Sequence, residues 1–406
     1  MIQQVSRSTL ARLRLANQRL VGSSFRSAVD AARWMTAMQG QDLPGALWSI
    51  GLRTPGIGMA DVRAALDTGQ IVRSWPLRGT LHLTAAEDLG WIMSVGSARM
   101  ISAAAGRHRQ LDICPSDVEK VRAVAVNMLE GGRSATRTDL LTAFQLAGQA
   151  TAAQRGIHLL WLLNLTGTLV QGPLAGTQQL FVLIEEWIPR PRRLERTEAL
   201  RELALGYFRS HGPAALADFA WWAKLTIKDA RLGLEENKEY LRELQYGTSN
   251  YWLSKESADS LTGKDLAGTR SLLLLPGFDE YLLGYADRSV ALDPGHADLV
   301  VPGGNGVFKP TIVSGGRVIG TWRKDAKTAE PAANASGAAL AGFRSATLDS
   351  DPVGPARAGR QPAKDPVTRA VGAEPIPFKQ LTPAQESAFG KSASRYANFL
   401  VSHGAG

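Results

Sequence analysis

The chain has 406 residues, 44% of them hydrophobic, which is enough for two or three compact domains and argues against a single domain. Its 46 lysines and arginines exceed its 37 acidic residues, and the net charge of +9 favours a polyanionic partner such as nucleic acid. The single cysteine excludes an intramolecular disulfide, and six histidines without a cysteine cluster predict no structural zinc site.

The amino terminus is rich in arginine but lacks the apolar segment and cleavage site of an export signal. No apolar run approaches the roughly 20 residues that span a bilayer. We therefore expect a soluble, cytoplasmic, nucleoid-associated protein without a membrane partner.

Positive charge is concentrated at the start of the chain. Between residues 1 and 41, Asp30 is the only acid. We expect the first helices to carry a concentrated positive field, although an ordinary solvated helix face is the alternative. The arginines concerned are Arg7, Arg12, Arg14, Arg19, Arg26 and Arg33.

A junction between two helices follows. Residues 31–38 show helical spacing, a glycine and a proline then break the helix, and Asp42 is placed to cap the next one. Gln39 and Gln41 fall in the junction. If the backbone is extended there, side chains two apart point the same way, so both amides would face one solvent-filled cleft. The alternative is two solvated loop glutamines.

Residues 59–66 then predict a helix, and residues 71–75 and 79–83 predict two strands joined around Pro76. This hairpin carries cations and small donors suited to phosphate and groove contacts. We favour Arg78 and His82 over Trp75 for contact, since alternate strand side chains belong to the core. The residues concerned are Arg73, Trp75, Arg78, Thr80 and His82.

The next stretch has the order of a winged-helix module. Helical spacing is found over residues 115–129, 134–144 and 152–165. Residues 168–171 and 179–184 then predict a hairpin across two glycines and a proline.

The same order returns further along the chain. Residues 195–210, 214–223 and 228–234 predict helices, and residues 240–245 and 250–253 predict the hairpin.

The two stretches align modestly, with Asp139 matching Asp218 and Leu140 matching Phe219. A third copy opens the chain, so we predict tandem winged-helix modules in a mainly helical α+β fold. The predicted modules span residues 1–110, which carry Gln39 and Gln41, residues 111–190 and residues 191–270.

Strands dominate beyond these modules. Residues 271–275, 311–313 and 317–322 predict a β-rich closing element over residues 271–324. Arg317 follows a glycine-rich turn and is a plausible DNA probe, because such a tip approaches a backbone closely. The sequence assigns no role to Asp279, Glu280 and Tyr281.

The carboxy-terminal part divides into two. Residues 325–372 are dominated by Ala, Gly and Pro, which predicts a flexible insertion without a core. Residues 373–406 contain a final amphipathic helix that we expect to dock on the body. Its apolar side carries Phe389, Tyr396, Phe399 and Leu400.

No familiar catalytic motif is present: the sequence lacks GxSxG, a Walker loop and HExxH. However, four segments in order closely resemble the AlkZ-like family of bacterial winged-helix DNA glycosylases. They are "MQGQDLPGALWSIGLR", "RSWPLRGTLHLTAAEDLGWIM", "LLPGFDEYLLGYADRS" and "NGVFKPTIVSGGRVIGTWR".

The resemblance implies a C-shaped body of tandem winged helices and a Gln-aliphatic-Gln motif that hydrolyses the N-glycosidic bond of N7-alkylated purines, crosslinks included. That motif falls on Gln39 and Gln41. The middle position is Gly40 instead of an aliphatic residue, which leaves the local backbone freer.

The expected activity is therefore a monofunctional DNA glycosylase, in self-resistance to a DNA-alkylating natural product. Neutral amides orient water and stabilise charge without acting as a full base. Asp42 is the alternative base. We expect a monomer that acts on double-stranded DNA carrying alkylated purines, without a cofactor or metal.

Two other functions would use the same basic surface. One is a winged-helix transcriptional regulator without catalysis, and the other is a structural or chromatin-type DNA binder without lesion preference. The glutamine pair favours the enzyme, because a regulator has no need for amides in a cleft away from its recognition helix.

Overall fold

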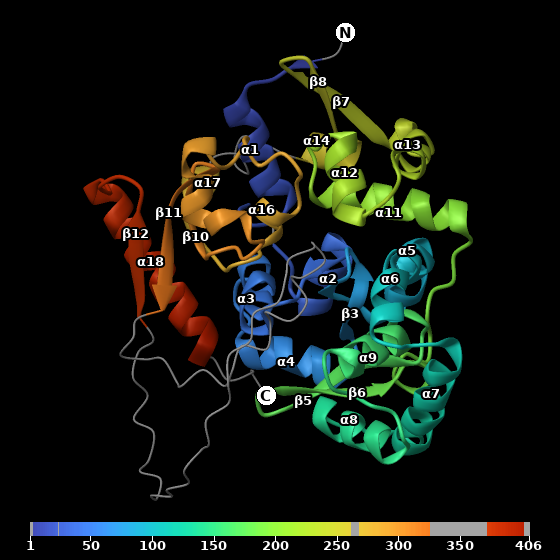
Figure 1. Cartoon of the computed structure of the whole chain (residues 1–406). Helices are drawn as coiled ribbons and strands as arrows, with labels where there is room; N and C mark the ends of the chain where they lie inside the picture. Colours follow the sequence, from blue (N-terminus) through green and yellow to red (C-terminus); the bar gives the residue numbers. More distant parts are fainter. Residues whose placement is uncertain (1–2, 23, 261–267, 325–371, 402–406) are drawn as a thin grey trace, which may run out of the picture.

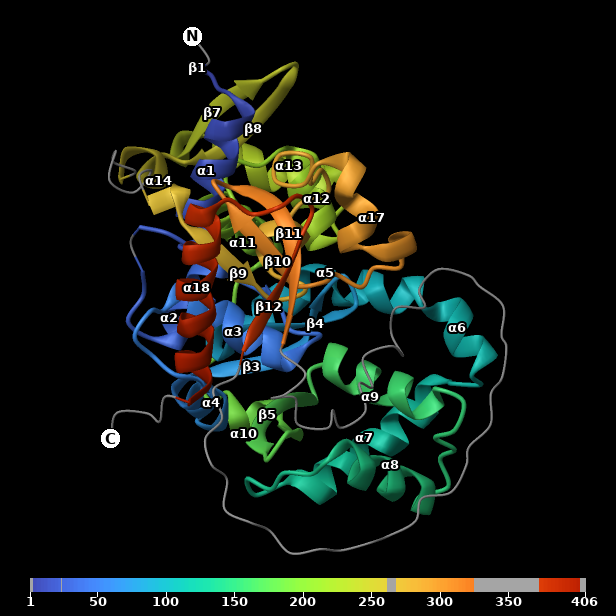
Figure 2. The ribbon, with the colours of Figure 1, turned by 90° about the vertical axis from the view of Figure 1, so that its left-hand side faces the viewer.

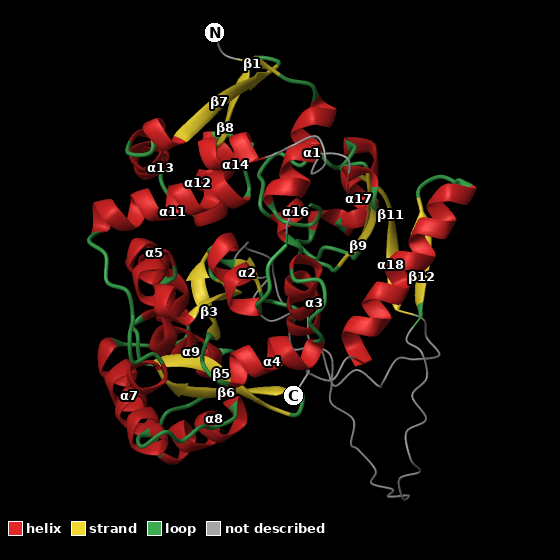
Figure 3. Ribbon diagram, turned by 180° about the vertical axis from the view of Figure 1, so that it is seen from behind, coloured by secondary structure: helices red, strands yellow, loops and turns green. Residues whose placement is uncertain are grey.

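The computed structural model describes residues 3–22, 24–260, 268–324 and 372–401. In these residues helices dominate and the strands form three small sheets, so the fold is mixed α+β and mainly helical, as predicted (Figures 1 and 3). The expected insertion over residues 325–372 lies outside the described residues except at its last position. No described helix combines the length and apolar character needed to cross a membrane.

The first region places the glutamine pair after a short helix. Helix α2 begins after Ser27, whose hydroxyl accepts a hydrogen bond from the Asp30 backbone at 3.2 Å. It ends at Met35, not at residue 38 as predicted, because Thr36 adopts a φ of 65°. The elements are β1 (Gln3–Gln4), α1 (Arg7–Asn17), α2 (Ala28–Met35), β2 (Met38–Gln39), α3 (Leu43–Arg53), α4 (Met59–Asp67), β3 (Ile71–Leu77), β4 (Thr80–Ala85), α5 (Leu89–Ala103) and α6 (Ala105–Gln110).

The second region has the predicted order of three helices and a hairpin. Helix α7 has the predicted bounds, whereas α8 begins three residues later than predicted. The delay arises because Ala135 pairs with Phe181 of the hairpin, and Thr136 then caps the helix. The elements are α7 (Pro115–Leu129), α8 (Arg137–Leu146), α9 (Arg155–Leu165), β5 (Leu169–Ala175), β6 (Gln178–Leu183) and α10 (Ile184–Trp187).

The third region repeats this order. Asp139 and Asp218 hold equivalent places, since each accepts a hydrogen bond from the backbone three residues before it, at 3.0 and 3.1 Å. Leu140 and Phe219 are both fully buried, so the predicted alignment of the two regions is confirmed. The elements are α11 (Arg196–Ser210), α12 (Leu216–Ala223), α13 (Ile227–Glu235), β7 (Leu241–Tyr246), β8 (Ser249–Ser254) and α14 (Lys255–Ser260).

Two prolines lie inside strands instead of in the predicted turns. Pro76 belongs to β3 and Pro173 to β5, each where the pairing register shifts. Such an irregularity tolerates a residue that cannot donate to the ladder. The turns themselves fall after Leu77 and Ala175.

The first two hairpins belong to one sheet. Its order is β2-β4-β3-β5-β6, and the link between the hairpins is the antiparallel pair Arg73 and Gln171. A second sheet has the order β1-β7-β8. Hairpins from two predicted modules are therefore joined edge to edge beside the glutamine pair.

The closing element is a four-stranded sheet of order β12-β11-β10-β9, and Figure 2 shows α18 beside it. The final helix docks as predicted, since Phe389, Tyr396 and Phe399 are buried while Leu400 is only partly buried. Each such ring contributes roughly 1.5–3 kcal/mol of burial. The elements are β9 (Leu272–Leu275), α16 (Glu280–Leu283), α17 (Ala297–Val300), β10 (Thr311–Ser314), β11 (Arg317–Lys324), β12 (Ala373–Pro377) and α18 (Pro383–Val401).

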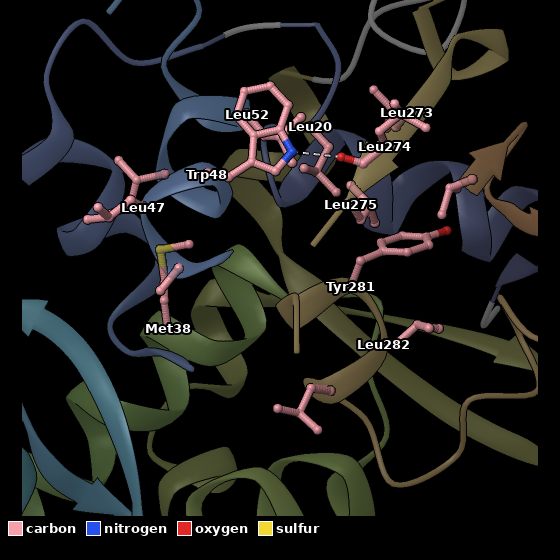
Figure 4. Close-up of a cluster of buried hydrophobic side chains, with 14 of the residues drawn as sticks. Leu20, Met38, Leu47, Trp48, Leu52, Leu273, Leu274, Leu275, Tyr281 and Leu282 are labelled. Atoms are coloured by element: carbon pink, nitrogen blue, oxygen red, sulfur yellow. Dashed lines mark hydrogen bonds between the residues drawn. The ribbon is translucent and has the colours of Figure 1, made fainter. Parts of the chain in front are cut away.

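One large core joins this sheet to the amino-terminal helices. The Trp48 indole N–H donates to the Leu274 carbonyl at 2.8 Å, which ties α3 to β9 (Figure 4). One turn along the same face of α3, a Cβ at Gly51 would lie 2.4 Å from the Phe399 ring, so α18 packs directly against the α3 backbone. Strand β9 and the final helix α18 therefore both pack against α3, directly after the glutamine pair.

The amino-terminal arginines point partly inward. Arg14 is 1% exposed, donates to the Pro213 carbonyl at 2.9 Å and lies 3.6 Å from the Asp218 carboxylate. Arg12 donates to the Thr269 hydroxyl at 2.7 Å. The prediction of a concentrated positive field is therefore wrong for these two arginines, because they join α1 to other parts of the fold.

Candidate active site

The glutamine pair lies between α2 and α3, on a short edge strand. Met38 and Gln39 form β2, in which Gln39 pairs with His82 of β4. The Gly40 N–H then donates to the Leu81 carbonyl at 2.7 Å. Asp42 occupies the N-cap position of α3, as predicted, but its side chain makes no capping hydrogen bond. The motif therefore begins on an extended edge strand at Gln39 and bends at Gln41, and β4 fixes it along one side.

Both amide side chains turn toward the beginning of β4. The Gln39 Oε1 accepts from the Thr80 hydroxyl at 3.1 Å, and the Gln41 Oε1 accepts from the Leu81 N–H at 3.2 Å. Among the described residues, no acceptor takes a hydrogen bond from either side-chain NH2 group. Two NH2 groups, with four N–H donors between them, and the second lone pair of each oxygen are left for water or substrate.

The two glutamines differ in exposure. Gln39 is only 7% exposed, whereas Gln41 is half-buried. The alternative of two solvated loop glutamines is therefore wrong for Gln39. A cavity of about 270 Å³ lies elsewhere, between α5, α9 and α10, and neither glutamine lines it.

A buried carboxylate holds the backbone of the motif. Glu280, 1% exposed, accepts from the Gln39 N–H at 2.7 Å through Oε1. Its Oε2 accepts from the indole N–H of Trp222 at 3.0 Å and lies 3.2 Å from Nε2 of His211. Burial raises the pKa of Glu280, but the His211 hydrogen bond and the Arg78 charge outweigh it and hold the pKa at about 2. The carboxylate is thus ionised, and burial lowers the pKa of His211, which donates as a neutral ring.

Local sequence patterns indicate no role for Glu280, His211 or Trp222. The available signal was an acid inside the apolar run "LLPGFDEYLL", because a charged residue within a buried segment needs partners. The sequence could not indicate which partners, since 241 residues separate Glu280 from Gln39.

Arg73 holds the motif from the opposite side. Its Nε donates to the Gly40 carbonyl at 2.7 Å and its Nη2 donates to the Gln41 carbonyl at 3.2 Å. Its Nη1 donates to the amide oxygens of Gln171 and Gln179 at 3.0 and 3.1 Å. The predicted DNA contact is thus half-buried and engaged within the protein.

His82 and Arg78 also face inward. His82 is fully buried, with Nδ1 2.8 Å from the Thr80 carbonyl and Nε2 3.2 Å from an Arg78 nitrogen. Burial and the Arg78 charge lower the pKa of His82 to about 3, so the ring is neutral. Arg78 donates to the Trp222 carbonyl at 3.0 Å and lies over the Trp221 ring. The prediction of DNA contact by His82 is not compatible with this burial, and Trp75 is core.

The remaining predicted residues lie at the surface or near it. Arg33 on α2 is exposed and pairs with Glu87 at 2.8 Å. Arg317 begins β11 after two glycines with positive φ, and its guanidinium lies 3.8 Å from Asp293. Neither arginine has a hydrogen bond to the glutamine pair among the described contacts.

Asp42 adjoins the pair. It is exposed at the surface, yet surrounding atoms partly desolvate its carboxylate and raise its pKa, while the Gly45 backbone, Lys324 and Arg73 oppose that rise. A carboxylate with a raised pKa accepts a proton more readily than an ordinary one. Asp42 is thus the titratable carboxylate that directly follows the two neutral amides in the chain.

Comparisons with known proteins bear on this site. The family model described as "DNA glycosylase AlkZ-like" matches residues 32–399. A relative from Streptomyces sahachiroi, an "Interstrand DNA cross-link repair glycosylase", is 25% identical over 323 residues, which are 76% of this chain and 85% of the relative. The solved structure of the Streptomyces sahachiroi DNA glycosylase AlkZ has a TM-score of 0.72 and 22% identity, covering 98% of this chain and 97% of that one.

Proposed function

Because this chain belongs to the AlkZ-like family of DNA glycosylases, we propose that it hydrolyses the N-glycosidic bond of bulky or crosslinking N7-alkylated purines in double-stranded DNA. The observation that carries the proposal is the convergence of Gln39 and Gln41 on the beginning of β4. The backbone of the motif is held by Glu280 on one side and Arg73 on the other. Preorganised dipoles of this kind stabilise charge that develops in a transition state.

The reaction needs little acid–base chemistry. An N7-alkylated purine is cationic, so the electron pair of the breaking N9–C1′ bond neutralises the departing base without a general acid. Water supplies the new C1′–O bond and releases a proton, for which Asp42 is the nearby acceptor. The amide oxygens of Gln39 and Gln41 face the positive charge that develops on the sugar, and their NH2 groups orient the water.

We also propose the finer architecture: tandem winged-helix modules over residues 1–110, 111–190 and 191–270 in a C-shaped body. The repeated order of three helices and a hairpin supports the last two modules. In this proposal the protein acts as a monomer, and the DNA substrate lies against the concave side of the body. Arg33 and Arg317 are the proposed phosphate contacts, since both keep exposed surface, at 47% and 33% of the side chain.

The main alternative is a winged-helix regulator that reads DNA with the third helix of a module. Such a helix needs a free face that enters the major groove. In the second module this helix is α9, and its residues from His158 to Leu165 are buried without interruption. Burial on every side favours the glycosylase over a regulator that uses this module.

The test is incubation of the purified protein with duplex DNA that carries N7-alkylguanine, with detection of free base and abasic sites. We expect release from adducted DNA and none from the same duplex without the adduct. Binding without release would favour the regulator, and equal binding to both duplexes without release would favour a chromatin-type binder. Release from natural-product adducts would extend the proposal to self-resistance.

A further inference from the structure

Arg73 has a place in the sheet that gives it access to the glutamine motif. It lies on β3, between β4 and β5, where it pairs with Leu83 on one side and Gln171 on the other. Its guanidinium reaches two consecutive carbonyls of the motif, at Gly40 and Gln41. Gly40 and Gln41 lie outside any helix, so their carbonyls make no helical hydrogen bonds. The Arg73 guanidinium donates to both carbonyls instead.

The guanidinium is itself fixed. Four of its hydrogen bonds go to protein oxygens, two on the motif and two on the amides of Gln171 and Gln179. The Gln179 amide is oriented in turn, because its NH2 donates to the Gly172 carbonyl at 3.0 Å. Burial lowers the pKa of Arg73 to about 10, with Asp42 opposing, so the group stays protonated at neutral pH. Four of the five donors of a guanidinium are thus used within the protein, and one is left for a phosphate.

Gly40 explains why the motif needs this support. A Cβ at Gly40 would lie 3.3 Å from the His82 backbone carbon, which is tighter than ordinary van der Waals contact. Glycine fits this approach to β4, but it leaves the local backbone without the stiffness that a side chain gives. A hydrogen bond from Arg73 to the Gly40 carbonyl restores that stiffness.

We propose that Arg73 is a positioning residue that fixes the direction of the Gln39 and Gln41 amides, and that Gln171 and Gln179 from the neighbouring hairpin hold it in place. The inference rests on the proposed glycosylase function. It assigns to Arg73 a role inside the protein instead of the DNA contact predicted from sequence. The edge-to-edge joining of the two hairpins brings Gln171 of β5 and Gln179 of β6 into contact with Arg73.

The test compares Arg73→Ala and Arg73→Lys with Arg122→Ala, a matched control that removes another half-buried arginine far along the chain from the motif. Single-turnover release from N7-alkylguanine DNA separates the rate constant from the affinity. We expect Arg73→Ala to slow release by about 10²-fold, the scale of a small misplacement of reacting groups. Affinity for the DNA and its salt dependence should stay at the wild-type values. Arg73→Lys should recover only part of the rate, because a lysine lacks the planar fork.

Chemical rescue gives a readout that a general loss of stability would not move. Guanidinium at low, non-denaturing concentration should restore part of the Arg73→Ala rate and leave Arg122→Ala unchanged. A weaker affinity, with a salt slope reduced by about one, would overturn the proposal and identify Arg73 as a phosphate contact. Wild-type release by Arg73→Ala would overturn it as well.

Amide hydrogen exchange separates this inference from the proposed function. The Gly40 N–H donates to the Leu81 carbonyl, so its protection reports on the motif directly. Protection should fall in Arg73→Ala and stay in Arg122→Ala. If wild-type protein releases no base, the proposed function fails, but the exchange protection of the Gly40 N–H still tests the positioning role of Arg73. Unchanged protection in Arg73→Ala would refute the positioning role.

Discussion

Two adjacent buried acids, Asp279 and Glu280, serve different parts of the molecule. Asp279 accepts two hydrogen bonds from the Arg53 guanidinium, at 3.0 and 3.1 Å, and one from the Ser49 hydroxyl at 2.6 Å. These contacts join the loop to α3, and the full charge of an arginine neutralises the acid. Glu280 instead accepts from a backbone N–H of the glutamine motif and from two neutral rings.

The difference shows that burial and charge do not by themselves mark a functional acid. Asp279 holds elements that pack against the large core, so its replacement should lower the free energy of unfolding. Glu280 holds the Gln39 backbone, so its replacement should lower the rate of base release. The two acids therefore offer a matched pair in which stability and activity separate.

The largest expected effect is on stability. Asp279→Ala leaves the Arg53 guanidinium buried at 0% exposure without its partner, and removal of one member of a buried ion pair lowers stability by about 3–5 kcal/mol. Urea unfolding measures this loss. Glu119→Ala, which breaks the pair between an exposed glutamate and half-buried Arg122, is the control and should change stability by at most about 1 kcal/mol. The release rate per folded molecule should stay unchanged, and a slow but stable Asp279→Ala protein would contradict the comparison.

Glu280→Gln should show the opposite balance. The new amide can still accept from Gln39, but its NH2 group would face the Trp222 and His211 donors, which costs about 1–3 kcal/mol. Release should slow by up to about 10²-fold because Gln39 shifts, while DNA affinity is kept. Single-turnover rates and affinities measured on the folded variant check this. A variant that loses stability but releases base at the wild-type rate would make Glu280 structural, like Asp279.

Acid should act on the site in two steps. The pKa of His82 falls from 6.5 unfolded to about 3 folded, so its contribution is complete above pH 6.5 and is lost as pH falls below that value. The pKa of Glu280 falls from 4.5 to about 2, so its contribution is lost only below pH 4.5. Thermal unfolding from pH 8 to pH 4 should show a flat melting temperature and then a decline below about pH 6.5. In His82→Gln that decline should be shallower, and an unchanged decline would assign it to other histidines.

The smallest effect is expected where the closing sheet meets residues 325–371. Lys324 and Ala373 are paired neighbours on β11 and β12, so a short turn can join them in place of those residues. A shorter connection has a smaller entropic cost of closure, so the free energy of unfolding should stay within about 1 kcal/mol of the wild-type value or rise slightly. Thermal unfolding of the shortened chain measures this. A large destabilisation would show that the replaced residues contribute to the core.

Local patterns in the sequence predicted much of the fold. Helix α7 has the predicted bounds because a proline opens it, apolar residues recur at helical spacing and glycines follow it. The glutamine pair was placed between two helices for similar reasons. The predicted turns at Pro76 and Pro173 were wrong because an irregular strand pairing tolerates a proline, and that pairing depends on the partner strand.

The support of the site could not be predicted, because it depends on distant packing. Arg73 carries the same charge whether it faces a phosphate or the Gly40 carbonyl, and only the neighbouring strand shows which. Glu280 meets Gln39 across most of the chain. Buried positions of this kind follow from the assembled tertiary structure and leave little trace in local spacing.

The catalytic role of Gln39 and Gln41 is tested most directly by the single-turnover rate of base release by the Gln39→Ala/Gln41→Ala double variant on N7-alkylguanine DNA. Loss of preorganised dipoles should slow release by about 10²-fold or more, while DNA affinity and the melting temperature stay near the wild-type values. Release at the wild-type rate would contradict the assignment of the two amides as the catalytic groups and would make Asp42 the next residue to replace.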